Sequence, residues 1–387
     1  MVGSLSKLNH IVITRPLFYI FSIFLLVQLI LFYKIGVFTG LEAEKYIQQG
    51  NLLYKTGELS EPKYIFYLPV ILLVYFCRLT ELSVHFIVLL QVILSALAMF
   101  CFYKLGKNIS NKTIAFYSTV LLVLFIPLQV WNFFLYSDSI FISLTIIYTY
   151  LVYVYGERGP KGIIIILLFL FVLIFSRPNG MLFIPPLIIF LLFKTWQSRQ
   201  LQILCRVLCL FFLVSFYFLL NAAFRGGGEL DIIRPFVEEH IICFVPTKTT
   251  GINIDIIRTS NPLNDLFYYI IHNPVHFLRL TALKLFSFFN LTRSYYSTAH
   301  NTFLLIFIIP VYFFSTIGIF KFLTSNSNSP LFIISLLVLY PLAISFQCDD
   351  WHSRFTMIII PYLIFFGVYG FEKTRNSFSF KKNNELP

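Results

Sequence analysis

The run Cys348–Arg354, with the sequence CDDWHSR, places several ionisable side chains between two strongly apolar stretches. Charged groups in such surroundings are candidates for function by default. An arginine guanidinium can bind a phosphate through two parallel hydrogen bonds, so Arg354 is a candidate for phosphate binding, with His352 beside it. The other interpretation is a short solvated loop anchored by Trp351.

A second candidate group follows the first long apolar stretch, in the run GLEAEKY that ends at Tyr46. Glu42 stands where a carboxylate can meet both water and lipid, and it is also suited to stabilise a helix N-terminus through the helix dipole. The following residues predict a short amphipathic helix on the membrane surface, ended by Gly57. Its apolar positions are Ala43, Tyr46, Ile47, Leu53 and Tyr54.

The long polar segment 225–300 contains a second predicted amphipathic helix, over 263–288. We expect one apolar side and polar residues on the other faces. The apolar side comprises Leu263, Phe267, Ile270, Ile271, Phe277 and Leu278, and the polar residues are Asp265, His272, His276, Arg279 and Lys284. The segment ends in Arg293, Tyr295, Tyr296 and His300. Tyrosines beside an arginine are also typical of an interfacial aromatic belt.

Two further charges interrupt otherwise continuous apolar sequence. Asp138 follows Ser137, and this pair can cap the next helix or face a metal ion or another cation. Arg177 opens the run RPNG, which predicts a turn.

The composition places all these residues in a membrane protein. The 387 residues are 58% hydrophobic and 12% charged, against roughly 25% charged in soluble domains, and the mean hydropathy is +0.82. These values exclude disordered, collagen-like, coiled-coil and disulfide-scaffold proteins. We expect one domain over 1–387 with an all-α fold: a polytopic bundle of about ten or eleven spans with interfacial helices. The expected spans are 16–37, 64–80, 82–103, 114–131, 138–155, 161–176, 180–194, 201–223, 302–322, 330–347 and 355–371.

The distribution of charge predicts the topology. The net charge of +12 comes from short basic connections that are typical of cytoplasmic loops, so we expect no nucleic acid partner. Twelve of the 17 carboxylates fall in 38–63, 225–300 and 348–354. We expect these loops to share the outward face and the tail 372–387 to be cytoplasmic. The number of membrane crossings in 64–112 stays open. If 64–80 and 82–103 both cross the membrane, the basic loop that begins at Lys104 lies outside, which the positive-inside rule disfavours.

The six cysteines lack metal-ligand spacing. Cys243 and Cys348 fall in two of the outward segments, so a disulfide between them is one alternative that the sequence leaves open.

In their order along the chain, these motifs resemble the C-type (GT-C fold) membrane glycosyltransferases. The resemblance is to the branch of dolichyl-phosphate-mannose protein mannosyltransferases and lipid A aminoarabinose transferases. The matching positions are Glu42 and Tyr46, Asp138, Arg177-Pro178 and Arg354-Phe355. The first motif departs from the family's Asp-Glu-x-x-Tyr pattern, because Glu42 replaces the leading Asp and Ala43 the second acid, with Glu44 one residue further on.

The resemblance implies inverting transfer of a sugar from a polyprenyl-phosphate-linked donor to an acceptor hydroxyl on the outward face. The general base would be Glu42, with Glu44 as the second candidate. The residues expected at the donor phosphate or substrate are Tyr46, Asp138, Lys284, Arg293, Tyr296, His300, His352 and Arg354. The one cofactor considered is a divalent cation, Mg²⁺ or Mn²⁺, with Asp138, Glu44 or His300 as ligands.

The expected partners are this donor, a lipid, glycan or protein acceptor, and membrane lipids. The plain basic C-terminus favours a bacterial inner (plasma) membrane with a site that faces the periplasm or outside. Two other classes stay open. An O-antigen-type polymerase or ligase would also use arginines and a histidine in large outward loops, and a lipid-linked-sugar flippase or transporter would show internal repeats and midplane charges.

Overall fold

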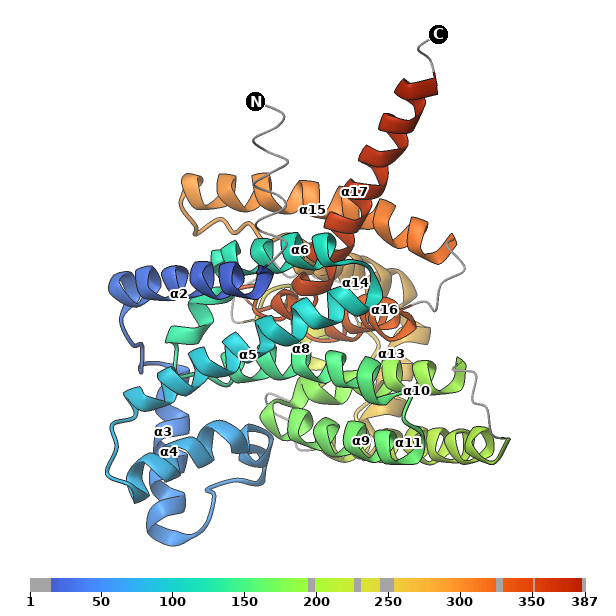
Figure 1. Ribbon diagram of the computed structural model, residues 1–387. Coiled ribbons are helices and arrows are strands. Elements are labelled where there is room, and N and C mark those ends of the chain that lie inside the picture. Colours follow the sequence, from blue (N-terminus) through green and yellow to red (C-terminus); the bar gives the residue numbers. More distant parts are fainter. Residues whose placement is uncertain are drawn as a thin grey trace. The chain divides into compact units, whose positions relative to one another are not determined.

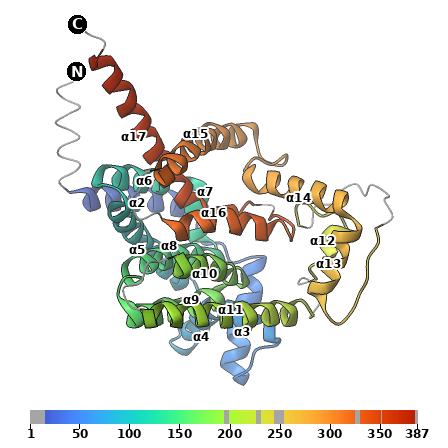
Figure 2. The same cartoon turned by 90° about the vertical axis from the view of Figure 1, so that its right-hand side faces the viewer.

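The computed structural model describes residues 15–193, 199–225, 231–243, 254–324, 330–350 and 352–384. Within these ranges the chain is helical, with two isolated β-bridges and no longer strand, so the predicted all-α fold is confirmed (Figures 1 and 2). The chain forms two compact units. The first comprises Met1–Met181, Pro310–Pro330 and Ile360–Pro387, and the second comprises Leu182–Ile309 and Leu331–Ile359.

Six helical segments in the described ranges are long and apolar enough to cross a membrane. They are α2 (Pro16–Ile35), Pro62–Leu79 (η1, Pro62–Tyr67, followed by α4, Leu68–Leu79), α5 (His85–Ile109), α8 (Ser137–Tyr155), α9 (Gly159–Ser176) and α15 (Thr298–Thr324). A seventh span is formed if Lys112–Leu124 and Ile126–Phe133, which are bent by 66° at their junction, count as one. The chain is therefore a multi-pass membrane protein.

Among the described residues, fewer helices than the predicted ten or eleven are long enough to cross a membrane. The stretches Pro178–Phe193 and Leu331–Ile344 are shorter apolar helices, and within α11 (Arg199–Arg225) the apolar part is Leu213–Ala222. The last predicted span begins later than expected, after the 3₁₀ turn η5 (Thr356–Ile358). Its helix α17 (Ile360–Asn384) continues through most of the expected tail.

Helix α8 lies at the centre of the first unit and packs along α5, as both views show. Two of its threonines are buried without loss of hydrogen bonds, because their hydroxyls donate to backbone carbonyls about one turn earlier. Thr145 donates to Ile142 O at 2.7 Å and Thr149 to Thr145 O at 2.9 Å. Thr149 and the Tyr362 hydroxyl lie 2.6 Å apart, which ties α8 to α17.

A buried amide network joins α2, the segment Ile126–Phe133, α5 and α8 within the first unit. Gln28 of α2 donates to Gln129 at 2.9 Å, and Asn132 donates to Gln28 at 3.1 Å and to Ser95 of α5 at 3.2 Å. Ser139 of α8 completes the network by donating to Asn132 at 2.7 Å. Because lipid offers no competing hydrogen bonds, such side chains hold membrane helices in a fixed register.

The second unit contains the predicted amphipathic segment, and the prediction of one helix is wrong there. Pro274 lacks an N–H, so the segment divides at Asn273 into α13 (Pro262–His272) and α14 (Pro274–Phe289). Part of the predicted apolar side, including Phe267, Ile271 and Leu278, is exposed. The core is instead built from Leu266, Tyr269 and Leu280 around Phe236 of α12 (Arg234–Val237).

Cys243 and Cys348 form a disulfide in the second unit, with Cα atoms 5.0 Å apart. Cys243 N donates to Asp349 O and Asp349 N to Ile241 O, both at 2.8 Å. The disulfide and this pair of hydrogen bonds join the start of the ionisable run Cys348–Arg354 to a segment about a hundred residues earlier. Trp351, the expected anchor of that run, lies outside the described residues.

Candidate active site

Glu42 is the first residue of α3 (Glu42–Thr56), which the left-handed Gly57 ends as predicted. Leu41, directly before it, has a φ of 55°. This conformation costs a residue with a side chain about 1–3 kcal/mol, and it persists only where the surroundings hold it. The backbone conformation at Leu41 therefore fixes the position of the Glu42 backbone, from which the carboxylate side chain extends.

The Glu42 carboxylate is held by a chain of hydroxyl groups. The Tyr46 hydroxyl, one turn along α3 and fully buried, donates to Glu42 Oε1 at 2.7 Å and lies 3.2 Å from Ser137 Oγ. Burial raises the pKa of Tyr46 well above its ordinary value, and the nearby negative charge of Glu42 raises it further. Tyr46 thus stays protonated and remains a donor to Glu42. Lys45 adds a looser contact, with Nζ 3.9 Å from Glu42 Oε1.

Asp138 and Arg177 form a buried ion pair next to this chain. Asp138 lies in the first turn of α8, and Arg177 follows the last residue of α9. Asp138 does not act as the helix cap that its position allowed, since no side chain caps α8. Arg177 is close enough for its charge to act on Tyr46. Three distant parts of the sequence thus meet: α3, the start of α8 and the end of α9.

Asp138 and Glu44 were expected as ligands of a divalent cation. Asp138 is paired with Arg177, and Glu44 is exposed on α3. Within the described ranges, no group of three or more His, Cys, Asp or Glu residues is placed to hold a metal ion. The divalent cation stays a prediction.

In the second unit, Arg293 is engaged with protein groups. Its Nη2 lies 2.7 Å from Asp349 Oδ2, and its Nη1 contacts the carbonyl oxygens of Asn290, Ser287 and Thr292. Ser287 also donates to Asp349, at 3.0 Å. Burial raises the pKa of Asp349 to about 6, although the Arg293 charge opposes this shift. Arg293, expected at the substrate, here holds the loop that carries Asp349.

The other expected residues near this loop, from 296–300 and from the loop itself, lie nearer the surface. Arg354 Nε is 2.8 Å from Asp350 Oδ2, and its side chain is 18% exposed. Tyr296 stacks on His300 with ring centroids 4.4 Å apart, and its ring is nearly parallel to that of His352 at 6.3 Å. Burial raises the pKa of Tyr296 to about 12 and lowers the pKa of His352. These four residues and Asp350 form one surface cluster of the second unit.

Lys284 is buried and is not part of this surface cluster. Its Nζ lies 3.8 Å from the centroid of the Phe236 ring and has no hydrogen-bond partner among the described residues. Burial lowers its pKa to about 7. Lys284, predicted on a face other than the apolar side of the segment, is thus buried beside Phe236.

The second unit also contains a buried chain of titratable groups that the sequence did not indicate. His276 Nε2 lies 2.9 Å from Glu239 Oε1, and His276 Nδ1 lies 2.7 Å from the Tyr269 hydroxyl. Asp265, predicted on a face other than the apolar side of the segment, is buried and accepts from Thr259. His276 and Glu239 lie 37 residues apart in the sequence, and helical periodicity carries no signal for such a partner.

Residues 60–220 match the dolichyl-phosphate-mannose-protein mannosyltransferase family. The match covers less than half of the chain and includes Asp138 and Arg177, but not Glu42 or Arg354. No curated protein matches the chain. The family match supports the resemblance to the C-type membrane glycosyltransferases, without selecting a branch.

The Arg177–Asp138 pair gives a stability prediction. Arg177→Met leaves Asp138 buried without its partner, which costs about 3–5 kcal/mol. Thermal unfolding of the detergent-solubilised chain should show a large drop in midpoint, and Asp138→Asn combined with Arg177→Met should recover part of it. The control is Arg258→Ala, in the exposed pair with Asp231, which should cost at most about 1 kcal/mol. An unchanged midpoint for Arg177→Met would contradict the pairing.

Lys284 gives a prediction about pH. Its folded pKa of about 7 lies below the ordinary value of 10.5, so between these values the unfolded chain holds a proton that the folded chain lacks. Stability should therefore rise as pH is raised from 7 to 9. Lys284→Met should raise the thermal midpoint at pH 7 and make the midpoint rise less steeply between pH 7 and 9. Lys63→Met, at an exposed lysine, should leave this pH dependence unchanged. An unchanged pH dependence of the midpoint in Lys284→Met would refute the lowered pKa of Lys284.

Proposed function

We propose that the protein transfers a sugar from a polyprenyl-phosphate-linked donor to the hydroxyl of a lipid, glycan or protein acceptor. The family match to residues 60–220 supports the class of reaction. The observation that carries the mechanism is the carboxylate of Glu42, held by Tyr46 beside the Asp138–Arg177 pair.

In the proposed reaction Glu42 acts as the general base. The acceptor oxygen attacks the anomeric carbon, its proton passes to the Glu42 carboxylate, and the bond from that carbon to the phosphate oxygen breaks. Polyprenyl phosphate leaves with the bonding electrons. Because attack and departure occur on opposite faces of one carbon, the anomeric configuration inverts.

The leaving phosphate is a weak base, so it needs a nearby positive charge more than a proton donor. In the first unit, Arg177 is the buried cation near Glu42 and Tyr46, and we propose that Asp138 holds it in place. In the second unit, the resemblance assigns phosphate binding to Arg354, and its partial exposure is compatible with that role. Lys284 and Arg293, the other cations expected at the phosphate, are engaged within the second unit: Lys284 packs on the Phe236 ring, and Arg293 is paired with Asp349.

We further propose that the second unit's loops face an oxidising compartment, as the outward side of a bacterial inner membrane would be. The support is the Cys243–Cys348 disulfide, since disulfides persist outside the reducing cytosol. A polymerase or ligase shares this orientation and is distinguished by a diphosphate-linked donor. A flippase would move such a lipid without forming a covalent product.

Two matched variants test the base. Glu42→Gln keeps the size of the side chain and removes its ability to accept a proton, so sugar transfer should fall by about 10²–10⁴-fold. Glu44→Gln tests the second candidate for the base, an exposed acid two residues away; transfer near the wild-type rate is expected, and a fall in Glu44→Gln alone would assign the base to Glu44. The assay follows label from polyprenyl-phosphate sugars into acceptors in membranes that contain the full chain. Wild-type transfer by Glu42→Gln would exclude this residue as the base.

A further inference from the structure

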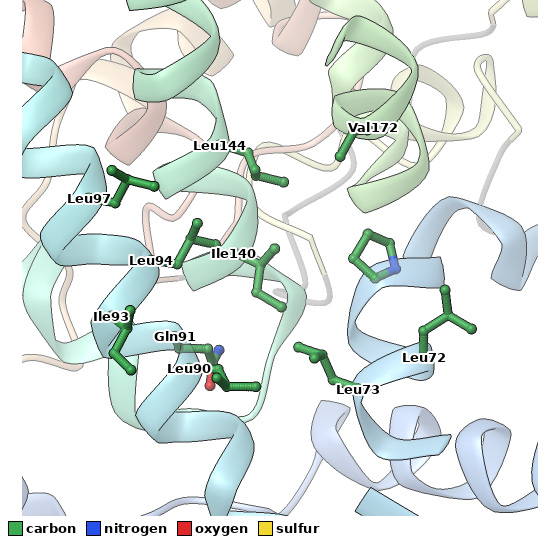
Figure 3. A pocket seen from close by; sticks show the side chains of 11 residues that line it. Leu72, Leu73, Leu90, Gln91, Ile93, Leu94, Leu97, Ile140, Leu144 and Val172 are labelled. Carbon is green, nitrogen blue, oxygen red and sulfur yellow. The ribbon is translucent and has the colours of Figure 1, made fainter. Parts of the chain in front are cut away.

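An apolar groove lies between α4, α5, α8 and α9 of the first unit, and it offers no partner to an ion (Figure 3). Of its eleven lining residues only Gln91 is polar, and none is charged. In Figure 3, Leu94 and Ile140 project from one side of the space and Leu73 from the other. The lysines and arginines of these helices lie instead near the helix ends, so a site for an anion is expected there.

Helices α5 and α8 run side by side in the same direction. Near the start of α5, Gln91 donates to Tyr136 O, directly before α8, at 3.1 Å. Further along, Cys101 of α5 lies close enough to Tyr150 of α8 for the two side chains to interact electrostatically, and Arg158 acts on the same tyrosine. The end of α5 and the loop after α8 therefore lie at one end of the first unit.

This end of the first unit has an excess of cations. Lys104, Lys107 and Lys112 fall at the end of α5 and the start of α6 (Lys112–Leu124), and these two helices pack against each other. The chain has no acid between Glu81 and Asp138 that could neutralise them locally. None of the three lysines has an acidic partner among the described residues.

The loop after α8 adds Arg158 and Lys161, with Glu157 as its one acid. The Arg158 guanidinium lies 4.5 Å from the centroid of the Tyr155 ring. Lys104 Nζ lies 5.3 Å from the centroid of a phenylalanine ring in the preceding turn. Such cation–π contacts position a cation and leave its charge in place.

Two of the lysines occupy positions that the helix dipole disfavours. Lys112 is the first residue of α6 and Lys161 lies in the first turn of α9, and neither helix has an acid in that turn. The N-terminal end of a helix carries a partial positive charge, so a cation there is repelled. An anion bound beside these lysines would relieve the repulsion.

The other end of α8, beside α3, is balanced within the chain. Residues 34–63 contain four lysines and four glutamates. Lys45 Nζ lies 3.9 Å from Glu42 Oε1, and Lys63 Nζ lies 3.0 Å from Glu61 Oε2. The excess of positive charge is therefore a property of the end where α5 finishes and α9 begins.

We infer that five cations at this end, here called the basic surface, bind the headgroups of anionic phospholipids. They are Lys104, Lys107, Lys112, Arg158 and Lys161. Helices α5 and α9 are long and apolar enough to span a membrane, so cations at these ends lie at the depth of the headgroups. Clusters of about four to eight basic residues beside a spanning helix attract anionic lipid. The inference is independent of the proposed sugar transfer.

The test measures lipid selectivity at the basic surface. The full chain is reconstituted into phosphatidylcholine vesicles with a trace of a phosphatidylglycerol or a phosphatidylcholine probe, each carrying the same diazirine next to its headgroup. Label is read in chymotryptic peptides that cover 104–112 and 156–161, because this cleavage does not depend on lysine. We expect the phosphatidylglycerol probe to label these peptides about fivefold more strongly than the phosphatidylcholine probe.

The variant that tests the surface removes three of its exposed lysines: Lys107→Gln, Lys112→Gln and Lys161→Gln. It should bring the labelling ratio of the two probes close to one. High salt tests the wild-type chain in the same way and requires no variant. An ionic strength of about 1 M shortens the Debye length to about 3 Å, so the wild-type ratio should also fall toward one.

The matched control removes three exposed lysines at the other end of the first unit: Lys34→Gln, Lys55→Gln and Lys63→Gln. It should keep the wild-type ratio at the basic surface. Equal labelling by both probes in the wild-type chain, a ratio that the surface variant leaves unchanged, or an equal loss in the control would overturn the inference. Loss of the ratio in millimolar inorganic phosphate would also overturn it, because a free anion would then be the ligand.

Discussion

The buried ion pair between Asp138 and Arg177 is the interaction on which the polar interior of the first unit depends. Among apolar helices an isolated charge is very costly, so each residue requires the other. The pair joins the start of α8 to the end of α9, and the same turn of α8 supplies Ser137 to the hydroxyl chain that holds Glu42. One electrostatic requirement thereby fixes the place where a carboxylate, a phenol and a guanidinium meet.

The requirement that buried polar groups have partners also applies in other parts of the molecule. The amide network of Gln28, Gln129 and Asn132 satisfies polar groups inside the first unit. In the second unit, the Arg293–Asp349 pair and the Cys243–Cys348 disulfide hold the ionisable loop against distant segments. In both units most of these polar side chains are buried with specific partners; Lys284, which packs on the Phe236 ring without a hydrogen-bond partner among the described residues, is an exception.

Composition and hydropathy were sufficient to predict the membrane class and the helical fold, because long apolar stretches have few other structures available in lipid. The local signal of Gly57 also predicted the end of α3. The partner of Asp138 could not be predicted, since Arg177 lies in another helix and neither sequence position indicates the other. The burial of His276 and Lys284 was missed for the same reason: it depends on Glu239 and Phe236, which periodicity within one helix does not reveal. Pro274 did signal the break between α13 and α14, and the amphipathic pattern across it obscured that signal.

The central claim is that Glu42 activates an acceptor hydroxyl for direct displacement of polyprenyl phosphate. The most direct measurement is the anomeric configuration of the transferred sugar, determined by NMR of the isolated product and compared with that of the donor. A single displacement assisted by a general base predicts complete inversion. Retention of configuration would require two displacements through a covalent intermediate and would contradict the proposed role of Glu42.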